Sequence, residues 1–147
     1  MNTDETCILV CNKLLRGELS AIETYEQALE KFTDPGVREK LTKILSEHRE
    51  SAVALKSHVQ EMQATPSTDS GAWGTFAQAV EGTAKLFGEA AGLLALKEGE
   101  KHGIREYEDA LNDEGVMSSI KSTIRETLRP RLERHLSTLD SISVKDT

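Results

Sequence analysis

Apolar residues recur along most of the chain in alternating steps of three and four positions, the spacing of one face of an α-helix. Turn-forming residues interrupt this pattern at three places, so it predicts four long helices. We expect the helices at residues 4–33, 35–62, about 69–111 with an irregularity near Gly88, and about 116–142. At the first break, Asp34 should cap the second helix and Pro35 should stand in its first turn. Within the lead-in segment of the third helix, about 69–86, Trp73 and Phe76 should pack in the core or cover the end of the bundle.

These helices predict an all-α protein that forms a single domain over residues 1–147. Helices of this length would each span roughly 38 Å at about 1.5 Å per residue. Short connections favour antiparallel neighbours, so we expect an antiparallel up-down-up-down four-helix bundle. It would consist of two similar helical hairpins, at about 4–62 and 69–142. Of the three connections, the one at 64–71 could bridge a larger distance.

One pattern, Glu-x-x-x-Ile-x-x-Tyr-Glu-x-Ala-Leu, occurs twice, at residues 18–29 and 100–111. In each copy the first Glu, Glu18 or Glu100, takes a place in the helical spacing where an apolar residue is expected. His48 and His135 do the same in the second and fourth predicted helices. Charged groups at core positions are costly unless they are paired. We therefore predict that these four residues share one layer near the middle of the bundle.

The depths of the residues along their helices match well for Glu18 and His48 and less well for Glu100 and His135. Pro130 lies inside the fourth predicted helix and should kink it one turn before His135, because proline leaves the carbonyl four residues back without a partner. Such a kink, or a later start of the fourth helix, would bring Glu100 and His135 to the same depth along the bundle. Tyr25 and Tyr107 should fill one layer closer to the turns at 33–35 and 112–115, with their hydroxyls hydrogen-bonded.

Two carboxylates and two imidazoles that converge from four helices have two physical interpretations. The first is a metal site at Glu18, His48, Glu100 and His135, because these side chains bind Zn, Fe and Mn. The second is a metal-free network of two Glu–His⁺ pairs, which would fix the register of the helices at some cost in stability. The spacing alone leaves both interpretations open.

The composition agrees with a helical bundle, since 29% of the 147 residues are charged and only 4% are aromatic. The net charge is −7 and the cations are dispersed among acids, which argues against nucleic acid and anionic lipid as partners. No apolar run approaches the roughly 20 residues of a membrane span. The acidic N-terminus does not resemble a signal peptide, so we predict a cytoplasmic protein. Self-association through helix faces stays open.

Two further features bear on function. Cys7 and Cys11 lie one helical turn apart and could be half of a redox or metal site, but in a cytoplasmic chain we expect them to be small buried apolar groups. The chain has no Gly-rich phosphate-binding loop of the Walker or Rossmann type and no nucleophile with a neighbouring base. A hydrolase or nucleotide enzyme is therefore not supported.

The Glu-x6-Tyr pattern on two helices, with His on the two alternate helices, resembles the ferritin-like superfamily, which includes ferritins, bacterioferritins and rubrerythrins. The di-iron site of that superfamily takes one Glu from each of two helices and a Glu-x-x-His from each of the other two. The phrases Arg16-Gly-Glu-Leu-Ser-Ala-Ile-Glu-Thr-Tyr25 and Gly99-Glu-Lys-His102 are similar to uncharacterised bacterial four-helix-bundle proteins of this kind, a domain family of unknown function. The resemblance implies that the lone glutamates, the histidines and the tyrosines of the site correspond to Glu18 and Glu100, His48 and His135, and Tyr25 and Tyr107.

The chain departs from that pattern at two positions. Leu45 and Leu132 stand three residues before the histidines, where the superfamily has the carboxylates that bridge or chelate two irons. Glu47 and Glu133 point to other faces of their helices and do not replace them convincingly. A standard di-iron oxidase is therefore not expected, and enzymatic activity stays open. The sequence predicts a bundle with a two-Glu, two-His core that binds a metal ion. The alternative is a non-enzymatic structural or stress-related helical protein in which the four residues form a metal-free buried polar network.

Overall fold

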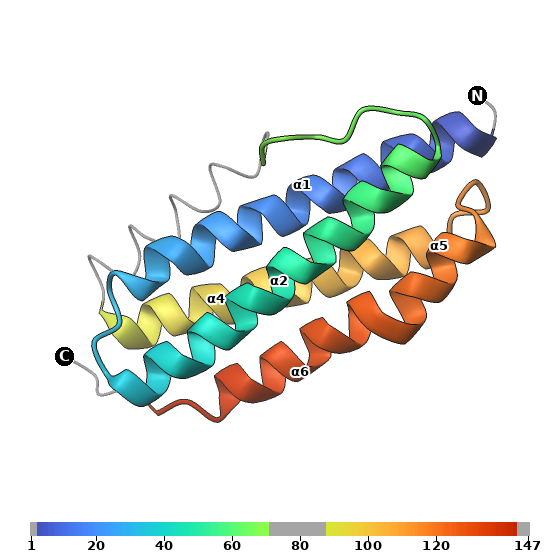
Figure 1. The fold of residues 1–147 in the computed structure, drawn as a ribbon. Coiled ribbons are helices and arrows are strands. Elements are labelled where there is room, and N and C mark those ends of the chain that lie inside the picture. The colour runs from blue at the N-terminus through green and yellow to red at the C-terminus, as the bar shows by residue number, and fades with distance from the viewer. Residues whose placement is uncertain (1–2, 71–87, 144–147) are drawn as a thin grey trace.

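The computed structural model describes residues 3–70 and 88–143, and within these ranges it is helical with no strand (Figure 1). The first two helices are α1, Thr3–Leu29, and α2, Pro35–Glu61, and the third is α4, Glu89–Leu111. The last helical rod has three consecutive parts: α5, Ser118–Thr123; the π-helical turn η2, Ile124–Leu128; and α6, Arg129–Asp140. The predicted all-α class with four long helical segments is confirmed.

The helix directions differ from the predicted up-down-up-down order. The backbone N–H of Thr33, just after α1, donates to the Glu89 carboxylate at the start of α4, over 3.4 Å. At the other end, Gly115 lies so close to Thr6 that a side chain at 115 would clash with it. Accordingly α4 runs antiparallel to α1 and in the same direction as α2, and the order is up-down-down-up (Figure 1).

The connection after α2 explains this difference, because it travels back along α1 instead of making a short turn. Asn12 hydrogen-bonds with Thr65 and Ser67, and the Ser70 hydroxyl donates to the Glu23 carboxylate. Five extended residues cover about 17 Å. The α-helical rise from residue 12 to residue 23 also covers about 17 Å. A connection whose described part already follows α1 over this distance removes the reason to expect α2 and α4 to be antiparallel.

The predicted lead-in helix at 69–86, with Trp73 and Phe76, lies almost wholly outside the described residues; Asp69 and Ser70 themselves are not helical. The irregularity expected near Gly88 is confirmed, because Gly88 has a φ of 92° and α4 begins at the next residue. Such a positive φ is readily adopted only by glycine.

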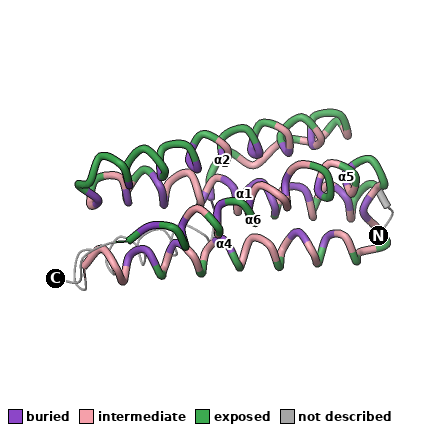
Figure 2. The backbone as a smooth tube through the Cα atoms, turned by 90° about the horizontal axis from the view of Figure 1, so that it is seen from below, coloured by how far each residue is buried: buried purple, intermediate pink, exposed green. Residues whose placement is uncertain are grey.

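The apolar residues form two cores, one toward each end of the bundle, and the buried positions lie on the inner faces of the helices (Figure 2). One core includes Cys7, Leu15, Leu55 and Ile124, and the other includes Phe32, Leu41, Leu96 and Leu139. The buried ionisable residues Glu18, His48, Glu100 and His135 have relative exposures of only 2–4%. They therefore occupy the interior of the bundle together with these two apolar cores.

The last helical rod is irregular just before Pro130: residues Ile124–Leu128 form the π-helical turn η2, and Pro130 stands in the first turn of α6. The kink expected at Pro130 stays a prediction. A π-turn accommodates one extra residue in a helix. The buried positions Ile120, Ile124, Leu128 and Leu132 follow one another in steps of four. Three such steps exceed the helical repeat of 3.6 by about 1.2 residues in total, close to the one residue that a π-turn absorbs. This turn keeps Ile120 and His135 on the same inner face.

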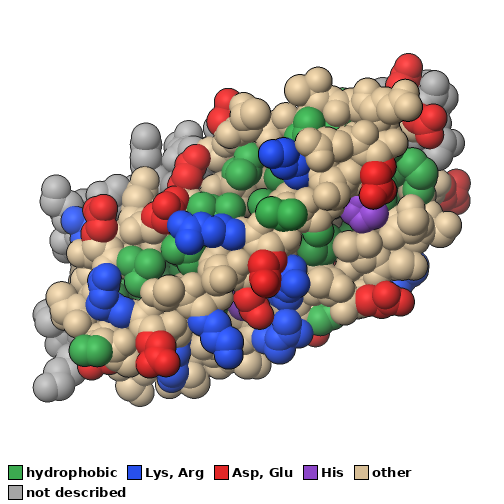
Figure 3. All heavy atoms as spheres, in the orientation of Figure 1, with side chains coloured by type: hydrophobic (Ala, Val, Ile, Leu, Met, Phe, Trp, Pro, Cys, Tyr) green, Lys and Arg blue, Asp and Glu red, His purple; other side chains and the backbone are tan. Residues whose placement is uncertain are grey.

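On the face shown in Figure 3, Lys and Arg side chains alternate with Asp and Glu side chains. Among the described residues, no helix has the length and apolar character that crossing a membrane requires.

Asp34 caps α2 as predicted, since the backbone N–H of Val37 donates to its Oδ2 over 3.0 Å. Asp34→Ala should lower the free energy of unfolding by about 1 kcal/mol, because one donor of the first turn loses its acceptor. Urea unfolding followed by circular dichroism measures this change. Asp34→Asn keeps an acceptor and is the control; equal stability of the Ala variant and the wild type would contradict the assignment.

Candidate metal centre

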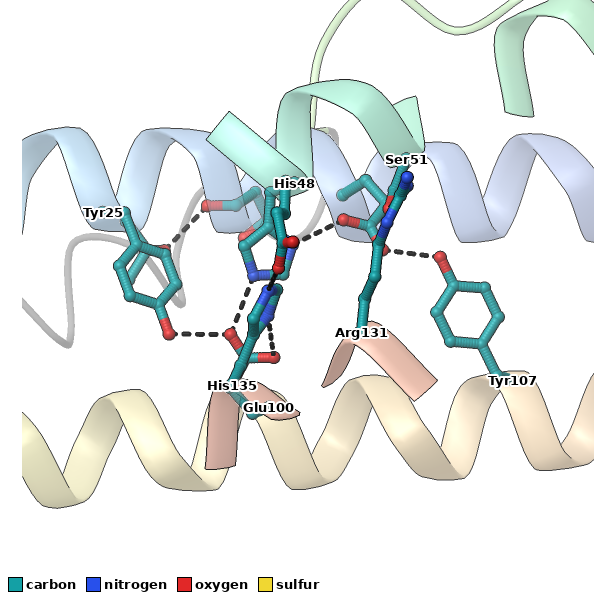
Figure 4. Close-up of polar contacts among 11 residues, drawn as sticks. Tyr25, His48, Ser51, Glu100, Tyr107, Arg131 and His135 are labelled. Atoms are coloured by element: carbon teal, nitrogen blue, oxygen red, sulfur yellow. Dashed lines mark hydrogen bonds and ion pairs between the residues drawn. The ribbon is translucent and has the colours of Figure 1, made fainter. Parts of the chain in front are cut away.

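The four predicted site residues come together from four helices: Glu18 from α1, His48 from α2, Glu100 from α4 and His135 from α6 (Figure 4). His48 lies between the two glutamates, with Nδ1 2.6 Å from Oε2 of Glu18 and Nε2 2.8 Å from Oε1 of Glu100. His135 approaches the other oxygen of Glu100, with Nδ1 3.3 Å from Oε2. The residues thus form a continuous hydrogen-bonded chain.

The two tyrosines hydrogen-bond across the bundle to the glutamate of the other copy of the pattern. The Tyr25 hydroxyl donates to Glu100 Oε1 over 2.7 Å, and the Tyr107 hydroxyl donates to Glu18 Oε1 over 2.5 Å. Their predicted role as core aromatics with a hydrogen-bonded hydroxyl is confirmed. Because α1 and α4 are antiparallel, Tyr25 and Tyr107 lie on opposite sides of the cluster (Figure 4). The sequence predicts the tyrosines one layer closer to the turns at 33–35 and 112–115, and these two turns lie at opposite ends of the bundle.

A carboxylate that sequence reasoning set aside also belongs to the cluster. Glu47 Oε1 lies 2.8 Å from Nε2 of His135, and its side chain is 26% exposed. The spacing along α2 gives only the angle between Glu47 and His48 around the helix axis. It does not show that this face of α2 packs against α6. In the sequence, the one feature that pointed to Glu47 was its position next to His48. Glu133, by contrast, pairs with Arg129 on its own helix.

Three of the side chains are close enough to hold one ion. His48, Glu100 and His135 each offer a ligand atom within 4.8 Å of the others, and all three are buried. Glu18 is not part of this group and reaches it through Nδ1 of His48. Leu45 and Leu132 lie in the apolar cores at 4% and 2% exposure.

The cluster has strongly perturbed pKa values. Burial alone would lower the pKa of His48, but the charges of Glu100 and Glu18 and their hydrogen bonds outweigh it and raise the pKa from 6.5 to about 10. Burial would raise the pKa of Glu100, but the charge of His48 and hydrogen bonds from both histidines lower it from 4.5 to about 2. In the metal-free protein His48 is therefore a cation between two carboxylates. Burial and the neighbouring carboxylates also raise the pKa of Tyr25 and of Tyr107 well above 10, so both hydroxyls stay protonated donors.

Cys7 and Cys11 are fully buried and not disulfide-bonded. Burial, followed by the charge of Cys7 and a hydrogen bond with it, raises the pKa of Cys11 to about 12. A thiol with so high a pKa is a poor nucleophile and metal ligand. Both cysteines belong to an apolar core, as predicted.

A family model, the domain of unknown function DUF2383, matches residues 7–113. The chain belongs to this family. The match contains Glu18, His48 and Glu100 and ends before α5 and α6, so His135 lies outside it. No curated protein and no solved structure matches the chain.

The pKa shifts predict how the stability of the metal-free protein depends on pH. The pKa of His48 is higher in the folded than in the unfolded state, so its contribution is complete below pH 6.5 and is lost as the pH rises toward 10. The pKa of Glu100 is lower in the folded state, so its contribution is complete above pH 4.5 and is lost as the pH falls toward 2.

Urea unfolding in the presence of a chelator tests this dependence. The stability difference between the wild type and His48→Gln should shrink between pH 6.5 and 10, and the difference from Glu100→Gln should shrink below pH 4.5. A difference that stays constant across both ranges would show that the cluster does not hold the charges assigned to it.

Proposed function

We propose that this protein binds one divalent transition-metal ion through Nε2 of His48, the Glu100 carboxylate and Nδ1 of His135. The observation that carries the proposal is the buried group of three ligand atoms within 4.8 Å of one another. Imidazole and carboxylate ligands in this ratio suit Zn, Fe and Mn. Three protein ligands leave at least one coordination position free for water or another small ligand.

The outer partners of the histidines support this assignment. A metal-binding histidine usually donates the N–H of its other ring nitrogen to a carboxylate or carbonyl, which fixes the tautomer and the orientation of the ring. Here Nδ1 of His48 faces Glu18 at 2.6 Å, and Nε2 of His135 faces Glu47 at 2.8 Å. Each ring therefore directs one nitrogen toward Glu100 and the other toward an outer carboxylate. In this arrangement Glu18 orients the ligand His48 and does not bind the metal directly, whereas the sequence suggested that Glu18 is itself a ligand.

Charge also favours a bound cation. Glu18 and Glu100 bring two negative charges into the interior, and in the metal-free protein one protonated imidazole offsets them. A divalent ion in its place would balance both carboxylates while His48 becomes neutral, as a ligand must be. The site would hold one ion, because the superfamily carboxylates that would support a second ion are Leu45 and Leu132 here.

We also infer a ferritin-like fold. Ferritin-like bundles have one long crossover connection. The segment between α2 and α4 follows α1 in this way over its described part, through residues 65–70. The relationship would account for glutamates on α1 and α4 and histidines on α2 and α6.

A metal-free polar network is the second candidate. Every ring nitrogen of His48 and His135 already faces a carboxylate oxygen, and both tyrosine hydroxyls are used. A fully hydrogen-bonded network of this kind can specify the register of a bundle without an ion. It predicts that substitution of His48 changes stability or assembly while the protein contains no metal.

Metal analysis of protein purified without chelator or nickel resin, followed by titration with Zn(II), Fe(II) and Mn(II), tests the proposal. We expect one equivalent in the wild type and its loss in His48→Ala and His135→Ala, since each removes a ligand. Glu18→Gln and Glu47→Gln should weaken binding about 10- to 100-fold, because each disturbs the orientation of a histidine.

His58→Ala is the matched control, because His58 is partly buried and hydrogen-bonds Thr123 away from the site. It should bind metal as the wild type does. Wild-type protein that binds none of the three metals would reject metal binding and leave the polar network.

A further inference from the structure

A cavity of about 60 Å³ lies between α1 and α4 and ends at the candidate metal centre. Its lining includes Glu18, His48 and Glu100. A cavity needs only about 10–15 Å³ to hold one water molecule, so this one has room for a ligand of a few heavy atoms. His135 is not in the lining, and the cavity therefore approaches the cluster from the side of α1 and α4.

Small residues line the cavity on both helices, with Gly17 and Ala21 on α1 and Gly99 and Gly103 on α4. Lys13, whose side chain is 54% exposed, is also in the lining, so the cavity meets solvent near this residue. Most of the surface that lines the cavity is apolar. Of the polar lining residues outside the cluster, Lys13 and Glu106 form an ion pair with each other over 3.1 Å. These features describe a narrow passage from the surface to the carboxylates.

The described residues do not pack so closely against Gly17 that only glycine would fit there. A Cβ added at Gly17 would meet no heavy atom of those residues within 4 Å. At Gly103, by contrast, an added Cβ would lie 2.8 Å from Leu132 Cδ1, so close packing of the helices explains that glycine. Glycine is a poor helix former, and Gly17 lies in the middle of α1. Among the described residues, close packing therefore does not explain glycine at this position, and the space beside Gly17 would accommodate one methyl group.

We propose that this cavity is the binding site for a small uncharged ligand of two or three heavy atoms, which reaches the cluster between α1 and α4. A contact between this ligand and a metal ion rests on the proposed function. Binding of the ligand in the cavity does not depend on it. Most of the surface that lines the cavity is apolar, so a charged ligand would lose its hydration there with few polar partners to replace it. At the inner end of the cavity, the Glu18 and Glu100 carboxylates would in addition repel an anion.

The test uses two probes on the full chain. Xenon, detected by shifts of amide resonances around the cavity, reports on the metal-free protein. Nitric oxide, detected by the electron paramagnetic resonance of its complex with Fe(II), reports on the loaded protein. Gly17→Leu should fill the cavity, Ala21→Leu is a second blocking variant one turn away, and Gly17→Ala is the matched control that adds a single methyl group.

We expect xenon and nitric oxide to bind the wild type and Gly17→Ala. Both blocking variants should lose the xenon shifts and combine with nitric oxide at least tenfold more slowly, at unchanged Fe(II) content. The proposal is overturned if metal-free wild type shows no xenon shifts, or if blocking variants that melt and bind Fe(II) normally react with nitric oxide as fast as the wild type. Xenon binding that the blocking variants abolish would support the cavity site even in a protein that binds no metal. Failure of the proposed metal binding and failure of the cavity proposal can therefore be told apart.

Discussion

The buried charge of Glu100 is the constraint on which the centre of the molecule depends. A carboxylate with 3% exposure is tolerated only because donors surround it. It accepts from Tyr25, faces Nε2 of His48 and Nδ1 of His135, and thereby connects α4 to the other three helical segments. No apolar residue could connect the helices with comparable directionality, because dispersion contacts tolerate small shifts and hydrogen bonds between charged groups do not.

The antiparallel arrangement of α1 and α4 lets one short sequence pattern serve both sides of this centre. Within one copy, Glu and Tyr are two turns apart and do not contact each other through the centre; each hydroxyl instead reaches the carboxylate of the opposite helix. Parallel helices would place both tyrosines on one side and leave the carboxylates on the other side without these donors. The helix order, which the crossover connection allows, is therefore a condition for the chemistry of the cluster.

Local spacing in the sequence predicts which residues are buried on each helix, but it does not predict how the helices are arranged around one another. Helix periodicity and the polar residues within it identified the four helices and the burial of Glu18, His48, Glu100 and His135, because a charge on an apolar face has to be compensated. The direction of α4 was mispredicted, since a connection of ambiguous length carries no directional signal. Glu47 was set aside because its partner His135 is on a different helix, and angles around α2 do not report contacts between helices.

Because of the π-helical turn at Ile124–Leu128, the direction in which His135 points depends on the number of residues in the helical rod before it. Without the extra residue, everything after the turn would rotate by about 100° around the helix axis. Leu136 would then take the place of His135, and Glu47 would lose its imidazole partner. The same shift would bring Glu133 and Asp140 to the buried positions of Leu132 and Leu139. The extra residue of this turn therefore holds the register of all of α6, and a single-residue deletion there would remove the centre and the apolar packing beside it together.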